Sequence, residues 1–276
     1  MKAAQYKYAQ PVDLGVATAL LRQGAGMGKV LGGGQSLGPM MNLRLVQPEL
    51  LVDLSAVTSL RDCIDASDTV TLGAGITHAQ IEDGKVPDPS CGMMPFVAAN
   101  IAYRAIRNRG TFGGSLAHAD PAADWINVMA VLDARYLLQG PDGLREVAQA
   151  GWMDGAFTTA LREDELLTAV RIPRLSASAC WSYIKINRKA GEFAEAIAIF
   201  VDDAARNVRC GLIGATDGTP HLITDASLLL DGWDAAFADA QLQAAGLSPQ
   251  TYEYQLHAAA LERAAAEISR KKGIIK

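Results

Sequence analysis

The sequence RNRGTFGGSLAHADPAAD, residues 107–124, decides the fold of this chain. It has an upstream counterpart, LGGGQSLGPMMNLRL, at residues 31–45. Both segments place glycines beside small hydroxylated residues. Glycine lets the backbone turn at positive φ and lets N–H groups approach a ligand with no Cβ in the way. If folding brings the two segments together, we expect them to hold the pyrophosphate of a dinucleotide from both sides.

The composition is that of an ordinary globular protein. The chain has 276 residues, 50% of them hydrophobic and 20% charged, and its formal net charge is −5. This length predicts two or three subdomains. Because the charge is negative and there is no basic run, nucleic-acid binding is not expected.

The cysteines predict no metal centre within this chain. Cys63, Cys91, Cys180 and Cys210 are far apart and none has CxxC spacing, so we expect reduced, packed thiols. No stretch approaches the ~20 apolar residues of a membrane span, and the first residues lack a secretion signal. A cytoplasmic location is expected, with a surface that is compatible with loose membrane attachment.

The hydrophobic pattern predicts strands and helices in three regions. Residues 1–53 indicate a βαβ-like lobe, residues 54–176 a larger middle lobe, and residues 177–276 an antiparallel sheet followed by helices. Within the middle lobe, one helix is expected over residues 96–106 and another over 123–132. The last region predicts three strands, at 181–185, 194–202 and 207–214, and helices near 235–245 and 251–266. The basic tail Arg270–Lys271–Lys272 is expected to be solvated or to face a partner.

The first glycine segment follows a predicted strand. It consists of Gly32, Gly33, Gly34, Gln35 and Ser36, flanked by Leu31 and Leu37. It is not a Walker loop, since no Gly-Lys-Ser/Thr follows, and no acidic residue marks it as a standard dinucleotide motif. We expect its N–H groups and the Ser36 hydroxyl to bind an anion, although an ordinary glycine-rich turn is the alternative.

The second segment is denser in reactive groups. It consists of Thr111, Phe112, Gly113, Gly114 and Ser115, followed by His118 and Asp124. Asp124 either accepts hydrogen bonds from ribose or adenine, or caps the next helix. His118 and Asp120 have no third ligand nearby, so no metal site is expected.

A third segment, YIKINRKAGEFAEA at residues 183–196, follows a strand and contains Lys185 and Phe193. A solvated basic turn is the alternative reading of its spacing. No Ser-His-Asp arrangement, nucleophile elbow or catalytic carboxylate pair is present, so no catalytic side chain is expected. If the chain is an enzyme, a cofactor carries its chemistry.

Together, in this order, the three segments resemble the FAD-binding medium subunit of the molybdenum hydroxylases, the carbon monoxide dehydrogenase and xanthine dehydrogenase family. The resemblance implies an α+β fold. It comprises a two-part FAD-binding domain of the PCMH type, with lobes at 1–53 and 54–176. A C-terminal domain with a three-stranded antiparallel sheet and helices follows at 177–276.

The resemblance also implies a cofactor and partners. FAD is expected in this chain, whereas a molybdenum–pterin cofactor is expected in a large subunit and two 2Fe–2S clusters in a small subunit. The assembly is expected to be a dimer of heterotrimers. The medium subunit would pass electrons from the 2Fe–2S subunit through FAD to an external acceptor.

Residue by residue, the resemblance implies that the two glycine segments bind the pyrophosphate and that Asp124 bonds the adenosine side. Leu166 and Leu167 pack against the cofactor, Lys185 lies near the flavin, and Phe193 shields one face of it. Leu31, Leu37, Phe112 and His118 complete the set. The chain has Ser115 where the family has Asn, and Phe193 where Trp or Tyr is frequent. These departures affect the expected tuning of the flavin rather than its binding.

Two other functions fit the sequence. One is a stand-alone FAD-dependent reductase or oxidase of related two-lobed fold, which needs a proton donor at the flavin that the sequence does not reveal. The other is a non-enzymatic nucleotide-binding scaffold whose glycines only form turns. The substrate and the electron acceptor are not encoded in any motif of this chain.

Overall fold

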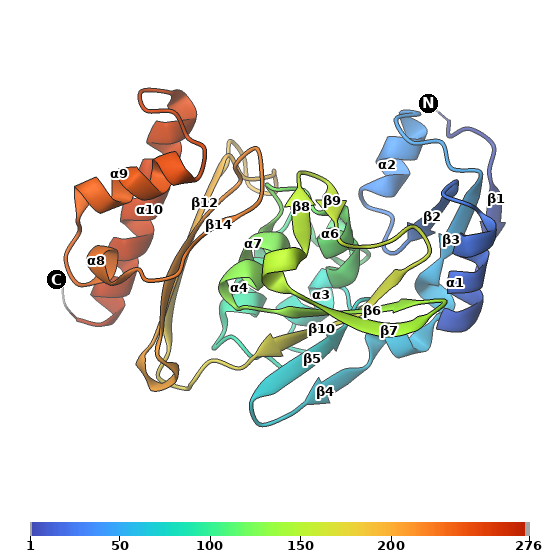
Figure 1. Ribbon diagram of the computed structural model, residues 1–276, viewed down its shortest axis with the longest axis horizontal. Helices are drawn as coiled ribbons and strands as arrows, with labels where there is room; N and C mark the ends of the chain where they lie inside the picture. The colour runs from blue at the N-terminus through green and yellow to red at the C-terminus, as the bar shows by residue number, and fades with distance from the viewer. Residues whose placement is uncertain (1, 274–276) are drawn as a thin grey trace.

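Three main sheets follow one another along the chain, and a short hairpin lies beside the second (Figure 1). The computed structural model describes residues 2–273. The strand orders are β1-β3-β2, then β4-β5-β10-β6-β7, then β11-β12-β13-β14. The sheets fall within the three predicted regions, whose exact boundaries stay a prediction.

The N-terminal lobe is a small parallel sheet with two helices. Its elements are β1 (Lys7–Ala9), α1 (Leu14–Gln23), β2 (Gly28–Leu31), α2 (Leu37–Asn42) and β3 (Leu50–Asp53). The Asp13 side chain caps α1 by accepting from the Val16 N–H. Because β3 is parallel to both neighbours, the three strands end at one edge, and the first glycine segment leaves the sheet there. This is the edge at which open parallel sheets usually bind ligands.

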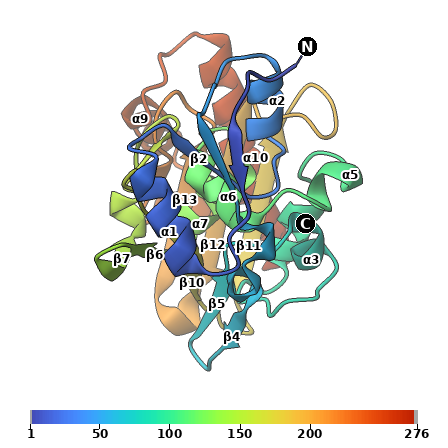
Figure 2. The ribbon, with the colours of Figure 1, turned by 90° about the vertical axis from the view of Figure 1, so that its right-hand side faces the viewer.

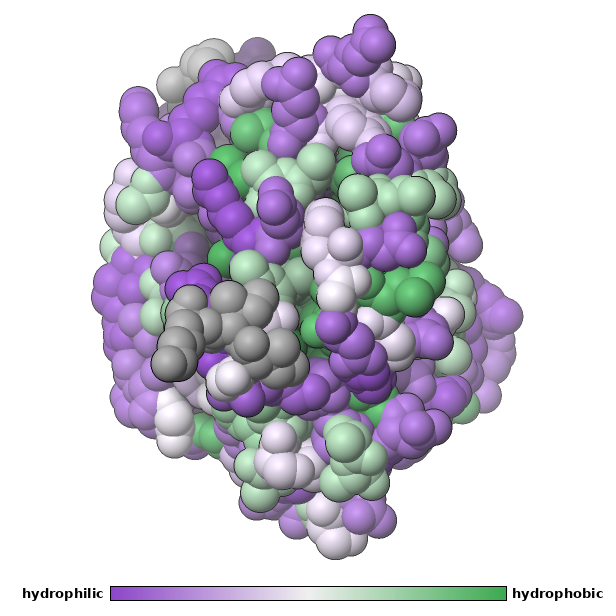
Figure 3. Space-filling view, turned by 90° about the vertical axis from the view of Figure 1, so that its left-hand side faces the viewer, coloured by the Kyte–Doolittle hydropathy of each residue, from purple (hydrophilic) through white to green (hydrophobic). Residues whose placement is uncertain are grey.

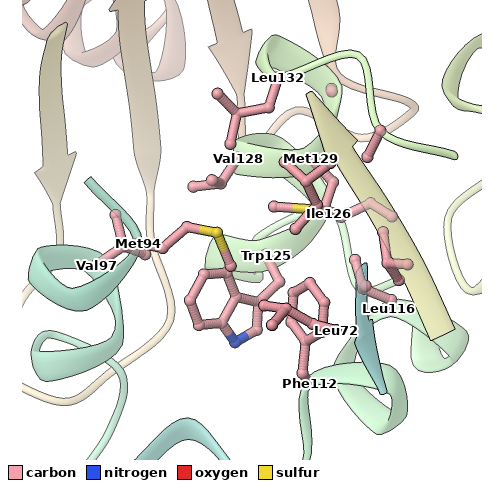
Figure 4. Packing of buried hydrophobic residues seen from close by; sticks show 14 of the residues in the cluster. Leu72, Met94, Val97, Phe112, Leu116, Trp125, Ile126, Val128, Met129 and Leu132 are labelled. Atoms are coloured by element: carbon pink, nitrogen blue, oxygen red, sulfur yellow. The ribbon is translucent and has the colours of Figure 1, made fainter. Parts of the chain in front are cut away.

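The middle lobe packs helices on an antiparallel sheet. Its helices are α3 (His78–Glu82), α4 (Met93–Ala99), α5 (Arg104–Arg107), α6 (Phe112–His118) and α7 (Asp124–Val131). Its strands are β4 (Cys63–Asp65), β5 (Thr69–Gly73), β6 (Arg135–Gly140), β7 (Gly143–Ala148), β8 (Met153–Gly155), β9 (Thr158–Thr159) and β10 (Leu166–Pro173). Trp125 is fully buried near Met94 and Phe112 (Figure 4), and the Phe112 ring meets it edge-on at 5.2 Å between centroids. The second glycine segment is thus anchored in the core through Phe112.

The C-terminal domain is a sheet covered on both faces. It comprises β11 (Cys180–Ile186), β12 (Ala196–Asp203), β13 (Val208–Gly214), β14 (His221–Ile223), α8 (Ser227–Leu230), α9 (Ala235–Ala244) and α10 (Tyr252–Lys271). All residues of β12 are buried. Alternate residues of this strand enter two different cores: Ile197, Ile199 and Val201 join the middle lobe, whereas Ala196, Ala198 and Phe200 pack under the C-terminal helices.

The three predicted C-terminal strands are present as β11, β12 and β13, but their predicted number is one too few, because β14 adds a fourth strand beside β13. Its three residues are too few to show an alternating pattern. On the outer side of this domain, hydrophilic and apolar residues are intermixed (Figure 3). No helix in the described part of the chain is both long enough and apolar enough to cross a membrane.

The single helix predicted over residues 96–106 is also wrong. The chain forms α4, breaks, and restarts as α5, and Ala102 in the break has φ 42°. The Arg107 guanidinium holds the break by donating to the carbonyl oxygens of Ile101, at 2.9 Å, and Ala102, at 3.0 Å. Neither glycine nor proline marks this corner, so the sequence carried no local sign of it.

Two lysines of the basic tail are exposed, as expected, but both also make contacts within the fold. Lys271 belongs to α10; its Nζ donates to the Trp181 carbonyl oxygen at 2.8 Å and lies 4.4 Å from the centroid of the Trp181 ring. Lys272 forms an ion pair with the buried Asp202. These contacts fasten the end of α10 to the sheet.

Candidate functional site

The two glycine segments touch. A Cβ atom built on Gly33 would lie 1.9 Å from the Arg109 carbonyl oxygen and 2.7 Å from Gly110 Cα. On Gly32 it would lie 2.8 Å from Thr111 Oγ1. Because no real Cβ comes so close to another backbone, only glycine permits this approach. The prediction that folding brings the segments together is confirmed.

Most glycines of the two segments are needed because another part of the chain lies close to them, not because the backbone turns at positive φ. Among the seven glycines of residues 31–45 and 107–124, only Gly34 has a positive φ, at 74°. Gly113 packs against the sheet instead, since a Cβ there would lie 2.3 Å from Ala74 Cβ. The expectation that the segments are bends at positive φ therefore holds at one position.

The first segment presents a run of free amide groups. Within residues 2–273, the N–H groups of residues 33–37 have no hydrogen-bond acceptor, and these residues are only partly buried. The Gln35 side chain donates to the Gly33 carbonyl oxygen at 3.0 Å and so folds over the turn. Successive free N–H groups in a turn attract an anion such as a phosphate.

The second segment differs from the expectation, because its amides are already used. The Phe112 N–H donates to Ile76 O at 2.8 Å, the Gly113 N–H to Ala74 O at 2.9 Å, and the Gly114 N–H to Thr111 Oγ1 at 3.1 Å. The segment is the first turn of α6, capped by Thr111, rather than an open loop. It offers a ligand the exposed backbone of Gly114 and the partly exposed Ser115 and His118.

His78 supports the second segment from below. Its backbone N–H donates to the Gly110 carbonyl oxygen at 3.0 Å, and its imidazole Nδ1 accepts from Trp125 Nε1 at 3.0 Å. That bond assigns the proton of the neutral imidazole to Nε2. Nε2 lies 2.8 Å from the place where a Gly110 Cβ would stand, so the ring packs directly against the bend. No motif or periodicity indicates this tertiary contact.

His78 makes the stability depend on pH. Burial lowers the pKa of this imidazole from 6.5 to about 4, and the nearby Arg107 charge adds to the effect. The His78 imidazole therefore binds a proton below about pH 6.5 in the unfolded chain, but only below about pH 4 in the folded chain. We expect the free energy of unfolding to fall by about 2 kcal/mol from this residue alone between about pH 7 and about pH 5.

Urea denaturation of the wild type and of His78→Gln at both pH values measures this effect. The glutamine keeps a hydrogen-bond acceptor for Trp125 but does not titrate, so its loss on acidification should be smaller by that amount. Equal losses in the two proteins would show that His78 is not buried in its neutral form.

Arg107 is a structural residue of the second segment. Its Nε and Nη2 donate to the two carboxylate oxygens of Glu82, each at 2.8 Å. This hydrogen bonding lowers the pKa of the Glu82 carboxyl. Arg104 binds Asp83 in the same forked manner, at 2.7 Å for both bonds. The two ion pairs join α5 to the C-terminal end of α3. They therefore fix the position of the chain that leads into Thr111.

An acidic residue ends β3, the strand that follows the first glycine segment, although the sequence showed no acidic residue at the distance expected for a standard dinucleotide motif. Asp53 closes β3 beside Leu31 of β2. Its Oδ2 accepts from the Tyr8 hydroxyl at 2.5 Å and its Oδ1 from the Ser55 N–H at 2.8 Å. Burial acts to raise the pKa of Asp53, but these hydrogen bonds together lower it. With both oxygens engaged, the carboxylate serves the fold of this edge.

Asp124 of the middle lobe and Lys185 of the C-terminal domain form an ion pair. Lys185 Nζ on β11 lies 3.0 Å from both carboxylate oxygens of Asp124 at the start of α7. The Tyr183 hydroxyl also donates to this carboxylate. Both charged side chains are less than a tenth exposed. Burial raises the pKa of Asp124, although Lys185 and Tyr183 both act to lower it. Their predicted contacts with FAD stay predictions.

The remaining predicted residues occupy two kinds of environment. Leu166 is buried against Ala17, Leu21 and Val52 of the N-terminal lobe, and Leu167 lies in the middle core. Phe193, by contrast, is 58% exposed in the loop between β11 and β12. An exposed aromatic ring suits the shielding of a flavin, whereas the two leucines lie beneath the surface.

The family of the chain follows from its N-terminal and middle lobes. A family model described as the FAD binding domain in molybdopterin dehydrogenase matches residues 4–175. The chain belongs to this family. Membership confirms the expected α+β fold, the FAD cofactor and the oxidoreductase class, and it makes the chain an FAD-binding medium subunit of the molybdenum hydroxylases.

Two relatives of known function are similar in sequence to this chain and support its assignment to the family. The chain is 33% identical over 265 residues to the nicotine 6-hydroxylase medium subunit of Paenarthrobacter nicotinovorans, covering 94% of this chain and 92% of the relative. It is 35% identical over 192 residues to the carbon monoxide dehydrogenase medium chain of Hydrogenophaga pseudoflava, covering 70% of this chain and 67% of the relative. Such relatives are medium subunits of multi-subunit enzymes.

Solved structures extend the likeness over the C-terminal domain. Carbon monoxide dehydrogenase from Hydrogenophaga pseudoflava, in a form that lacks the Mo-pyranopterin moiety, superposes with a TM-score of 0.87 at 28% identity, over 98% of this chain and 99% of that one. Quinoline 2-oxidoreductase from Pseudomonas putida 86 superposes with a TM-score of 0.83 at 28% identity, over the same shares. The four-stranded C-terminal sheet therefore belongs to a shared fold.

Proposed function

We propose that the chain holds FAD where residues 31–37 meet residues 111–118 and passes electrons from a 2Fe–2S subunit to an external acceptor. The observation that carries this proposal is the run of free amides at residues 33–37, pressed against the second segment at Gly33. A flavin dinucleotide has a doubly charged pyrophosphate, which is the anion that such a run suits.

The residues present fit this group. The amides of residues 33–37 would hold the pyrophosphate, while Gly114 and Ser115 would line its other side. Phe193 would cover one face of the ring system, because a phenyl ring can stack on it. Unlike Trp or Tyr, Phe193 cannot also donate a hydrogen bond. When bound, FAD supplies the electron-carrying chemistry. The chain's own part is to bind, orient and shield, and no side-chain proton transfer is required.

We further propose the partners that the resemblance implies. These are a large subunit with a molybdenum–pterin cofactor and a small subunit with two 2Fe–2S clusters, assembled as a dimer of heterotrimers. A cytoplasmic location fits the four free thiols of Cys63, Cys91, Cys180 and Cys210, since reduced cysteines are usual in reducing compartments. The alternatives of a stand-alone flavoenzyme and of a scaffold are less well supported, because the relatives are medium subunits.

An affinity tag on this chain tests the proposal. We expect the tagged chain to copurify with two further subunits and with about one non-covalent FAD per medium subunit. Rapid mixing of the assembly with its organic substrate should reduce the iron–sulfur clusters before the flavin. A flavin-free chain would contradict the proposal, as would a lone flavin-bound chain that oxidises the substrate unaided.

A further inference from the structure

The loop between β11 and β12, residues 187–195, rests on the middle lobe. Gly191 in this loop has φ 88°, and a Cβ built on it would lie 3.2 Å from Cε1 and from Cζ of the Tyr103 ring. It would also lie 3.3 Å from the carbonyl carbon of Ala102. Figure 2 shows this loop beside α5. The Tyr103 ring and the backbone of Ala102 together form a seat, or contact surface, for Gly191.

The seat is held firmly from the side of the middle lobe. Arg107 donates to the carbonyl oxygens of Ile101 and Ala102, and its other nitrogens are forked on Glu82. The Tyr103 carbonyl oxygen accepts from the N–H groups of Ile106, at 2.9 Å, and Arg107, at 3.0 Å. The same short run of chain continues into Thr111. The backbone around Tyr103 and the second glycine segment are therefore held in place by the same hydrogen bonds of Arg107.

The loop itself is held at its ends by bonds within the C-terminal domain. Arg188 Nε donates to Glu195 Oε1 at 2.5 Å, and the Tyr252 hydroxyl donates to Glu195 Oε2 at 3.2 Å. The Glu192 N–H donates to the Lys189 carbonyl oxygen at 3.1 Å, which closes the turn around Gly191. These bonds shape the loop but do not join it to the middle lobe, whereas the seat at Tyr103 does.

We propose that Tyr103 is a positioning residue for Phe193. By seating Gly191, its ring sets where Phe193, two residues later, stands over the flavin. The proposal rests on the proposed function, because Phe193 has a flavin to shield only if FAD binds here. Tyr103 acts through packing, since its contact atoms are ring carbons, and its hydroxyl is not required.

The test compares Tyr103→Ala with Tyr103→Phe in the purified assembly. Phenylalanine keeps Cε1 and Cζ and should behave as the wild type. Alanine removes the seat. We expect an unchanged FAD content but a shifted flavin reduction potential, stronger flavin fluorescence, and reoxidation by dioxygen about two- to threefold faster, because water and oxygen reach the ring more easily. Tyr6→Ala removes an exposed tyrosine from the N-terminal lobe and serves as the control.

A Phe193→Ala background shows whether Tyr103 acts through Phe193. Once Phe193 is absent, adding Tyr103→Ala should change potential, fluorescence and reoxidation no further. Equal effects in both backgrounds would overturn the proposal, as would wild-type flavin properties in Tyr103→Ala or an impaired Tyr103→Phe.

Hydrogen exchange of residues 187–195 gives a readout that does not need FAD. In protein freed of flavin, we expect faster exchange of this loop in Tyr103→Ala and wild-type exchange in Tyr103→Phe. Unchanged exchange would overturn the proposal even if the alanine variant loses FAD. A wild-type assembly without flavin would instead contradict the proposed function, so the two failures are distinguishable.

Discussion

Gly33→Ala is expected to weaken FAD binding markedly. The new Cβ would meet the Arg109 carbonyl oxygen at 1.9 Å and Gly110 Cα at 2.7 Å. Both are backbone atoms, so no rotamer change relieves the overlap and the two glycine segments must separate. Overpacking of this kind typically costs about 1–3 kcal/mol. We expect at least about a tenfold weaker affinity for FAD, which corresponds to the lower part of that range.

Gly38→Ala is the matched control. This glycine lies five residues on, in α2, and a Cβ there would meet nothing within 4 Å. Alanine should leave FAD content unchanged and stabilise the helix by about 0.5–1 kcal/mol. Gly32→Ala, whose Cβ would press on the Thr111 hydroxyl, should fall between the two. Flavin titration of the three variants measures the order. Full FAD content in Gly33→Ala would disprove the proposed role of the contact.

Lys185→Met is expected to be the most destabilising of the substitutions considered. It would leave the Asp124 carboxylate buried with only the Tyr183 hydroxyl as a side-chain donor. Removing one partner of a buried ion pair typically costs about 3–5 kcal/mol, because the other charge stays uncompensated. Asp124→Asn should cost a similar amount by stranding the ammonium group. Chemical denaturation at neutral pH measures both losses.

The double variant Asp124→Asn/Lys185→Met distinguishes a buried charge from a lost contact. Since burial already disfavours the Asp124 charge, removing both charges should restore much of the stability lost in either single variant. Glu146→Gln provides the control, because the Arg171–Glu146 pair at 2.7 Å is well exposed and should contribute less than about 1 kcal/mol. Strictly additive losses in the double variant would contradict this account.

Local chemistry made much of the fold readable. Asp13 and Thr77 are residue types that favour helix N-caps, and both accept a hydrogen bond from a backbone N–H in the first turn of their helix. Pro141, Asp142 and Gly143 are typical turn residues, and they lie at the hairpin between β6 and β7. The glycine segments were recognised from their composition, and their meeting followed from the anion that they would share.

The misses have a common physical origin in contacts between distant residues. The break before α5 depends on Arg107, which reaches back to two carbonyl oxygens, and no local residue type signals it. Lys271 is bound by Trp181, ninety positions away. Gly191 has a positive φ, which by itself favours glycine, but its contact with the ring of Tyr103 is a tertiary feature that the sequence did not indicate. Periodicity and caps say nothing about such partners.

The burial of β12 on both faces has a consequence for how the chain unfolds. Ile197, Ile199 and Val201 complete the middle core, so a protein cut before the C-terminal domain would leave that core open to water. Swinging the domain outward as a lid would expose the same side chains. We therefore expect a single cooperative melting transition, with release of cofactor and loss of structure occurring together.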